Sequence, residues 1–169
     1  RFYAWVSPRM EKVGYGERRG QLLAGLTGRV LEVGAGNGLN FAHYPPEVTG
    51  VLAVEPEPHL RALAETRASE TAVPIDVVDG TADQLPAADA SFNAVVASLV
   101  LCSVPDVPAA LTEISRVLKP GGELRFFEHV RADTPGLARV QRVLDATVWP
   151  ACGGGCHAQM YTMGTVLRH

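Results

Sequence analysis

The stretch Arg29-Val30-Leu31-Glu32-Val33-Gly34-Ala35-Gly36-Asn37-Gly38 decides the fold of this chain. It reads as a short apolar strand that carries an acid near its end and then passes into three glycines at alternate positions. Glycine adopts positive φ and has no side chain, so such a loop can turn sharply and let a ligand approach its backbone. A strand that runs into a glycine loop, with a helix behind it, is typical of the nucleotide-binding corner of an open α/β sheet.

The spacing of the glycines separates two classes of nucleotide-binding protein. Dinucleotide enzymes use G-x-G-x-x-G and hold a pyrophosphate at a helix N-terminus. Here the spacing is G-x-G-x-G, and Glu32 lies two residues before the first glycine. A carboxylate at the loop would repel a pyrophosphate but suits a ligand that carries an ammonium group. The pattern Glu32-x-Gly34-x-Gly36-x-Gly38 resembles the first motif of class I S-adenosylmethionine (SAM)-dependent methyltransferases.

This resemblance implies both a fold and a cofactor. The expected fold class is α/β, a Rossmann-like doubly wound sheet with parallel strand order 3-2-1-4-5. The expected cofactor is SAM, with S-adenosyl-L-homocysteine as its product. Apolar runs that alternate with helical patterns support this fold, because such units form parallel sheets with right-handed crossovers. The expected strands are residues 29–33, 51–54, 74–78, 91–98 and 123–130, and the expected helices are residues 9–26, 39–44, 59–70, 107–118, 137–149 and 157–169.

We expect a single domain with three parts. Residues 1–28 would form an N-terminal lid over the cofactor, with Arg19 on the water-facing side of its helix; residues 29–130 would form the SAM-binding core, and residues 131–169 a helical segment. Methyltransferases of this class add strands 6 and 7, which we expect to be missing here. The open edge of the fifth strand would then favour a homodimer. The chain starts without Met and stops within an expected helix, so we expect both ends of a longer protein to be absent.

The composition excludes several classes of protein. The 169 residues are 47% hydrophobic and 20% charged, which is typical of a soluble domain. A net charge of −3 offers no basic surface for nucleic acid, and no apolar run reaches the roughly 18 residues of a membrane span. The three cysteines, at positions 102, 152 and 156, cannot all pair with one another, which favours a reducing, cytoplasmic location. Cys152, Cys156 and His157 lack the second ligand pair of a zinc site, so we expect no metal.

Two polar residues follow the glycine loop at positions that suit the cofactor. Glu55 ends the second expected strand 17 residues after Gly38, close to the ~20 expected for a ribose-binding acid. Its carboxylate can accept hydrogen bonds from both ribose hydroxyls, with Pro56 beside it; the alternative is an acid that faces solvent at a strand end. Asn40 is placed to reach the methionine end of SAM, or equally to be a polar residue at a helix start.

The third and fourth strand ends complete the expected cofactor site. By the resemblance, the carboxylate that meets the adenine amino group is Asp79, with Asp83 as its rival. The fourth strand ends where the cofactor's sulfonium and the methyl acceptor should meet. The remaining residues assigned to the cofactor are Gly80, Thr81, Ala82, Ser98 and Leu99.

The candidates for a catalytic base are two histidines. His129 follows Glu128 at the ligand end of the fifth strand and titrates in the right range; the alternative is a strand-end histidine with a structural hydrogen bond. His157 is the second candidate. A thiol acceptor would need little help from a base, because a few per cent of a thiol is already thiolate at pH 7.

A narrower resemblance covers the second half of the chain. The segments Leu99-Val100-Leu101-Cys102-Ser103-Val104 and Glu128-His129-Val130 are similar to the thiol S-methyltransferase-like branch of the class. The resemblance implies a SAM-dependent methyltransferase (EC 2.1.1.-) for a small acceptor, namely a thiol, a phenol or quinone, or a lipid amine. The alternatives are an NAD(P)-dependent oxidoreductase on the same sheet and a catalytically silent SAM-binding protein.

Overall fold

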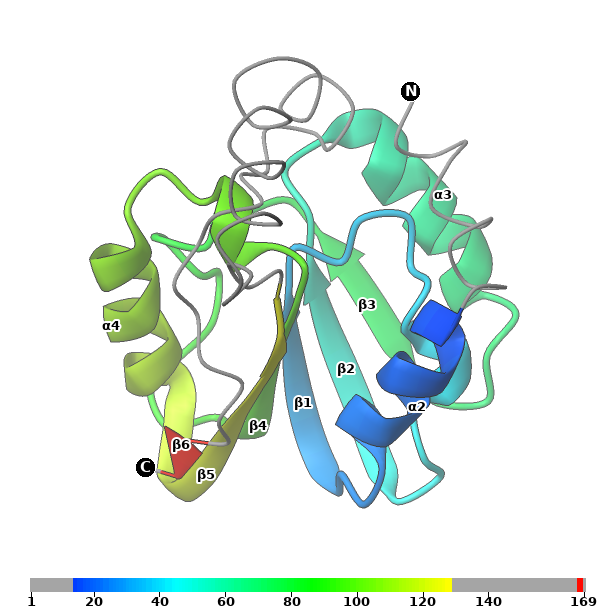
Figure 1. Ribbon diagram of the computed structural model, residues 1–169, viewed down its shortest axis with the longest axis horizontal. Helices are drawn as coiled ribbons and strands as arrows, with labels where there is room; N and C mark the ends of the chain where they lie inside the picture. The colour runs from blue at the N-terminus through cyan, green and yellow to red at the C-terminus, as the bar shows by residue number, and fades with distance from the viewer. Residues whose placement is uncertain (1–13, 129–166, 169) are drawn as a thin grey trace, which may run out of the picture.

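The computed structural model describes residues 14–128 and 167–168 (Figure 1). The α-helices and strands, in chain order, are α2 (Gly16–Leu23), β1 (Gly28–Val33), β2 (Val48–Val54), α3 (Pro58–Ala68), β3 (Ile75–Val78), β4 (Phe92–Ser98), α4 (Val107–Val117), β5 (Leu118–Phe127) and β6 (Leu167–Arg168). Two short 3-10 helices, η2 (Phe41–His43) and η3 (Leu101–Ser103), follow β1 and β4. The helix expected at residues 137–149 lies outside the described residues.

The described strands form one sheet of order β3-β2-β1-β4-β5-β6. All pairings among the strands β1, β2, β3, β4 and β5 are parallel, which confirms the expected order 3-2-1-4-5. The sequence interpretation was wrong at the outer edge of β5. We expected that edge to be open, but β6 pairs antiparallel with Glu123 and Leu124. The unpaired backbone groups of an edge strand are satisfied by such pairing, and residues 167–168 are therefore strand rather than part of the expected helix.

The register brings the carboxyl ends of five strands to one edge of the sheet. Val33 is paired with both Val54 and Ala97, Val54 with Val78, and Ser98 with Phe127. The residues that follow these strands therefore stand in a row along that edge, in the spatial order Asp79, Glu55, Gly34, Leu99 and Glu128. Ligands of open α/β sheets bind at this edge, where the strand order reverses.

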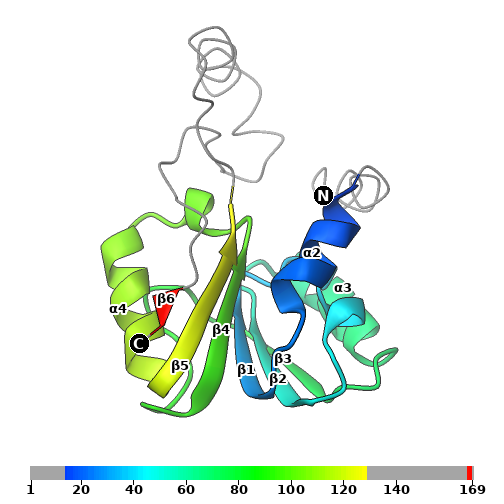
Figure 2. The same ribbon diagram turned by 60° about the horizontal axis from the view of Figure 1, so that its bottom comes forward.

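Both faces of the sheet are covered by helices. On β1, Val30 packs in a cluster with Leu23 of α2 and Ala64 of α3. Its neighbour Leu31 points the other way and packs in a second cluster with Ile114 of α4. Figure 2 shows the two layers, with α2 and α3 on one side of the sheet and α4 on the other. Because both faces are buried, the strands read as continuous apolar runs.

The boundary between α4 and β5 differs from the sequence prediction. We expected Lys119-Pro120-Gly121-Gly122 to stop a helix at residue 118 and the strand to begin at residue 123. The helix ends at Val117, and these residues already lie in β5. Gly121 has φ +79°, and a Cβ on Gly122 would lie 2.9 Å from the Lys119 carbonyl oxygen. The glycines thus let the chain turn directly from helix into strand.

Candidate functional site

The glycine loop follows β1 in a left-handed conformation. Gly34, Gly36 and Gly38 have φ of 64°, 57° and 78°. A Cβ on Gly34 would lie 2.1 Å from Val100 Cγ2, and one on Gly38 would lie 2.7 Å from the Phe41 ring. Glycine is therefore required at the first and third positions by both backbone conformation and packing.

Glu55 holds this loop against the end of β2. Its Oε2 accepts a hydrogen bond from the Gly36 N–H at 2.7 Å, and its Oε1 accepts one from the Glu57 N–H at 2.9 Å. Glu55 is 6% exposed, and burial raises its pKa, opposed by these two backbone N–H groups. Each carboxylate oxygen has a second lone pair, so Glu55 can pin the loop and still accept hydrogen bonds from a ligand.

Glu32, one residue before the end of β1, is buried and hydrogen-bonded within the protein. Its Oε1 accepts a hydrogen bond from Asn40 Nδ2 at 2.8 Å, and its Oε2 accepts one from the Tyr44 hydroxyl at 2.7 Å. Glu32 is 1% exposed, and burial raises its pKa to about 7. The pKa of Tyr44 is raised as well, by burial and by Glu32. The carboxylate for which we expected an ammonium contact thus has two donors from the protein.

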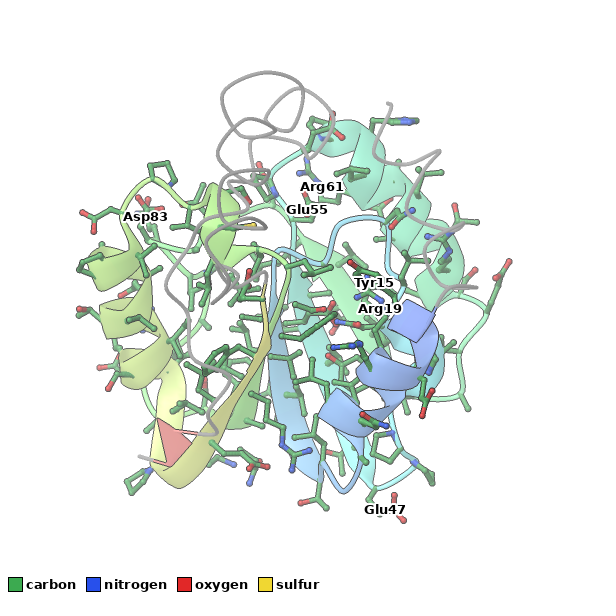
Figure 3. All side chains as sticks on the ribbon, in the orientation of Figure 1. Tyr15, Arg19, Glu47, Glu55, Arg61 and Asp83 are labelled. Carbon is green, nitrogen blue, oxygen red and sulfur yellow. The ribbon has the colours of Figure 1, made fainter. Side chains whose placement is uncertain are left out.

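Arg19 links the N-terminal helix to this cluster. Its Nη1 donates to Asn40 Oδ1 at 2.7 Å and to Ser98 Oγ at 3.0 Å. The side chain is 5% exposed and lies between α2 and the sheet (Figure 3), so its expected place facing water was wrong. The sequence carries the signal that we missed, because Arg19 precedes Leu23 by four residues and Leu26 by seven, on the apolar stripe of the helix.

A second arginine that the sequence analysis missed joins the ends of β2 and β3. Arg61 donates to the Glu55 carbonyl oxygen at 2.7 Å and to the Pro56 carbonyl oxygen at 3.1 Å, and it pairs with Asp79 at 3.0 Å. Figure 3 shows Arg61 next to Glu55, whereas Asp83 lies well apart. Asp79 is thus tied to the ribose candidate Glu55, and its rival Asp83 is not.

The small residues of the loop after β3 pack against neighbouring parts of the protein. A Cβ on Gly80 would lie 2.9 Å from Val54 Cγ1, so the backbone packs closely against the end of β2. Thr81 forms an isolated antiparallel bridge with Gln84. Ala82 packs at the margin of the second core cluster. The loop that we expected to read adenine is therefore a compact turn beside Glu55.

The ends of β4 and β5 are joined by a buried acid. Leu99 has φ +58°, and its N–H donates to the Phe127 carbonyl oxygen at 2.7 Å. Glu128 Oε1 accepts hydrogen bonds from the N–H groups of Val100 and Leu101, both at 2.9 Å. Burial raises the pKa of Glu128 to about 7. Glu128 was not among the site residues predicted from the sequence.

Other expectations have mixed outcomes. His129 and His157, our candidates for a base, lie outside the described residues.

The part of the chain that the structure describes holds no group of three His, Cys, Asp or Glu side chains placed to bind a metal ion. None of its helices has the length and apolar character of a membrane span. Cys102 is buried and disulfide-bonded, which departs from the reduced cysteines that we expected.

The sheet order, the glycine loop and the row of residues at its edge define a Rossmann-like protein of the class I methyltransferase type. Residues 31–126 match the family described as "Methyltransferase domain". The chain belongs to this family.

Among curated proteins, the chain is similar to the thiol S-methyltransferase TMT1B of Rattus norvegicus, with 42% identity over 134 residues that cover 76% of this chain and 53% of the relative. It is also similar to the ubiquinone/menaquinone biosynthesis C-methyltransferase UbiE of Methylobacterium nodulans, with 34% identity over 130 residues that cover 74% of this chain and 51% of the relative. The chain thus spans about half the length of these relatives. Its narrower likeness to thiol S-methyltransferases, expected from the sequence, is confirmed.

A comparison of structures supports the fold alone. The YcgJ protein from Bacillus subtilis has a TM-score of 0.70 and 24% identity, over 86% of this chain and 62% of that one.

Proposed function

We propose that this chain is the SAM-binding part of a methyltransferase that transfers a methyl group to a small molecule, with a thiol as the leading acceptor class. One observation carries the proposal. A left-handed glycine loop at the end of β1 is pinned by Glu55 at the end of β2 through the Gly36 N–H, at 2.7 Å. The likeness to a thiol S-methyltransferase, at 42% identity, supports a thiol as the acceptor.

The residues at the sheet edge fit SAM. Glu55 is placed to accept hydrogen bonds from the ribose, and Asp79, tied to it by Arg61, is placed to meet the adenine amino group. Glu32 is proposed to meet the ammonium group of SAM through the second lone pair of its oxygens, which already accept hydrogen bonds from Asn40 and Tyr44. Arg19, buried nearby and hydrogen-bonded to Asn40 and Ser98, is proposed to complement the carboxylate of SAM. Asn40 and Ser98 are hydrogen-bonded to Arg19. The other residues proposed for the cofactor follow the strand ends in the sequence, namely Pro56, Gly80, Thr81, Ala82 and Leu99.

SAM supplies a methyl group on a cationic sulfur, and the protein supplies position and electrostatics. The acceptor attacks the methyl carbon in line with the bond that breaks. Holding the two reactants in that alignment accounts for ~7–11 kcal/mol of the barrier. The turn at Leu99, fixed by its hydrogen bond to the Phe127 carbonyl oxygen, gives the cofactor site a rigid wall beside β4.

The acceptor class is tested by turnover. The full chain is incubated with methyl-labelled SAM and, in separate reactions, a small thiol, a hydroquinone and phosphatidylethanolamine. We expect transfer to the thiol, its loss in Glu55→Ala, and its retention in Glu47→Ala, an exposed acid far from the site (Figure 3). Transfer to another acceptor would reassign the substrate. Binding of SAM without transfer to any of them would favour the silent SAM-binding alternative.

Two further expectations belong to this proposal. A homodimer through β5 is tested by light scattering, since within residues 14–128 and 167–168 the outer edge of β5 is paired at Glu123 and Leu124 alone. A cytoplasmic location is tested by cell fractionation. Nucleic acid is not proposed as a partner, because the net charge is −3.

A further inference from the structure

The row of residues along the ligand edge of the sheet ends at Glu128. Asp79, Glu55 and Gly34 follow β3, β2 and β1, and Leu99 follows β4. The first three positions are accounted for by the adenosine part of the cofactor and the glycine loop. Glu128 directly follows β5, beside Leu99, and is therefore at the end of the row beyond β4, where the acceptor is expected.

The two carboxylate oxygens of Glu128 have different surroundings. Oε1 accepts hydrogen bonds from two backbone N–H groups, those of Val100 and Leu101. Glu128 as a whole is 8% exposed. Its Oε2 is buried and has no hydrogen-bond partner. A buried polar atom without a partner costs about 1–3 kcal/mol, so an unpaired oxygen at the edge of a site points to a ligand that completes it.

Glu128 is also held rigidly against the cofactor loop. Oε1 fixes the backbone N–H of Val100, and the side chain of Val100 packs onto Gly34, where an added Cβ would lie 2.1 Å from Cγ2. Val100 therefore lies between the carboxylate and the glycine loop and contacts both, which leaves the carboxylate little freedom to move. A group that must meet an acceptor in line with a methyl donor needs this kind of fixed position.

We propose that Glu128 is a catalytic residue, whose Oε2 accepts the proton of a protonated thiol acceptor during methyl transfer. This inference rests on the proposed function. The S–H bond breaks and its proton passes to Oε2, while the sulfur electron pair forms a C–S bond with the methyl carbon of SAM. The bond between that carbon and the sulfonium sulfur breaks at the same time. The products are a methyl thioether, S-adenosylhomocysteine and a protonated Glu128, which returns its proton to solvent.

The acidity of Glu128 agrees with this geometry. Burial raises its pKa to about 7, opposed by the backbone N–H groups of Leu101, Val100 and Cys102. A general base works best when its pKa is near the operating pH. His129, the base expected from the sequence, is not needed for this step.

Two thiols of different acidity test the proposal in the full chain. At pH 7, 2-mercaptoethanol is almost entirely protonated, whereas 4-nitrothiophenol is ionised and has no proton to lose. In Glu128→Gln, Oε1 can still accept from the two N–H groups, but Oε2 is replaced by a donor. We expect kcat/KM for 2-mercaptoethanol to fall by about 100-fold or more, and that for 4-nitrothiophenol by less than about threefold. SAM affinity should be unchanged.

The matched control is Glu123→Gln, the same change within β5, where Glu123 pairs with Arg125 away from the ligand edge. It should leave both rates unchanged. Equal losses on both thiols in Glu128→Gln, or no loss on either, would overturn the inference while leaving the proposed function standing. A wild-type protein that binds no SAM, or methylates neither thiol, would overturn both.

A second variant covers the case in which Glu128→Gln does not fold. Glu128→Asp keeps the negative charge but draws the carboxylate back by one methylene group. The same selective loss on 2-mercaptoethanol is expected, because Oε2 no longer reaches the acceptor. Equal rates for the variant and the wild type on that thiol would overturn the inference.

Discussion

Glu55 at the end of β2 and Gly36 in the loop after β1 are joined by a hydrogen bond of 2.7 Å between a carboxylate oxygen and a backbone N–H. This bond crosses the point where the strand order of the sheet reverses, which is where ligands of such sheets bind. It fixes the glycine loop before any ligand arrives. The site is thus organised by the protein's own contacts.

Replacing Glu55 should therefore destabilise the protein without ligand. Glu55→Ala leaves the N–H groups of Gly36 and Glu57 without their partner. Hydrogen bonds to charged groups contribute about 1.5–3 kcal/mol each. The unfavourable burial of the carboxylate, which raises its pKa, offsets part of their sum, so we expect a net loss of roughly 2–4 kcal/mol in the free energy of unfolding. Urea denaturation measures it. Glu47→Ala, at an exposed position, should change the free energy by less than about 0.5 kcal/mol, and equal effects would show that Glu55 does not hold the loop.

Neighbouring arginines on α2 should differ in importance. Arg19 is buried and donates to Asn40 and Ser98, whereas Arg18 is exposed. We expect Arg19→Met to cost about 2–3 kcal/mol of stability, because it removes charged hydrogen bonds in the interior. Arg18→Met should cost no more than about 1 kcal/mol, the worth of its contact over the Phe127 ring. Thermal unfolding of both variants compares them, and equal costs would contradict the buried position of Arg19.

Glu32 should make stability depend on pH in an unusual direction. The pKa of Glu32 is about 7 in the folded protein, against an ordinary value of 4.5. Between these values the folded state binds more protons than the unfolded state, so stability falls as pH rises from about 4.5 to about 7. The difference corresponds to about 3 kcal/mol at most. Urea denaturation at pH 5.5 and pH 8 should show higher stability at pH 5.5 and a smaller difference in Glu32→Gln. A larger difference in that variant would refute the assignment.

Two glycines with left-handed backbones should respond differently to alanine. Gly34 has φ 64° and would place a Cβ 2.1 Å from Val100, whereas Gly25 has φ 74° and open space around it. Gly25→Ala should cost only the conformational penalty of about 1–2 kcal/mol. Gly34→Ala should cost more, and Val100→Ala in its background should recover part of the loss. A double-mutant cycle measures this coupling; a coupling of zero would mean that the two residues do not pack together.

The sheet could be predicted from the sequence because its signals are local. Continuous apolar runs marked β1, β2 and β4, and the alternate glycines marked the turn after β1. The pairing of Leu167 with Leu124 could not be predicted in this way, because it joins residues that are distant in sequence. Sheet pairing of this kind depends on which edge the chain returns to, and a short segment carries no information on that.

The sequence predicted positions in the candidate site better than it predicted the contacts of their side chains. Spacing predicted Glu55, and the family resemblance predicted Asp79; each directly follows a strand. Spacing does not say what a side chain contacts, so the burial of Glu32 and Arg19 and the role of Arg61 emerged only from the structure. Glu128 was not predicted as a site residue, because the sequence does not show that its side chain accepts hydrogen bonds from the backbone after β4.

Binding of SAM at this edge of the sheet can be measured by titration calorimetry. The full chain, Glu55→Ala and Glu47→Ala are each titrated with SAM, S-adenosylhomocysteine and NAD. We expect one adenosyl ligand per wild-type chain, no binding of NAD, unchanged affinity in Glu47→Ala, and at least about tenfold weaker binding in Glu55→Ala, which is a loss of about 1.4 kcal/mol. Equal affinity of all three proteins for SAM, or binding of NAD alone, would contradict the account.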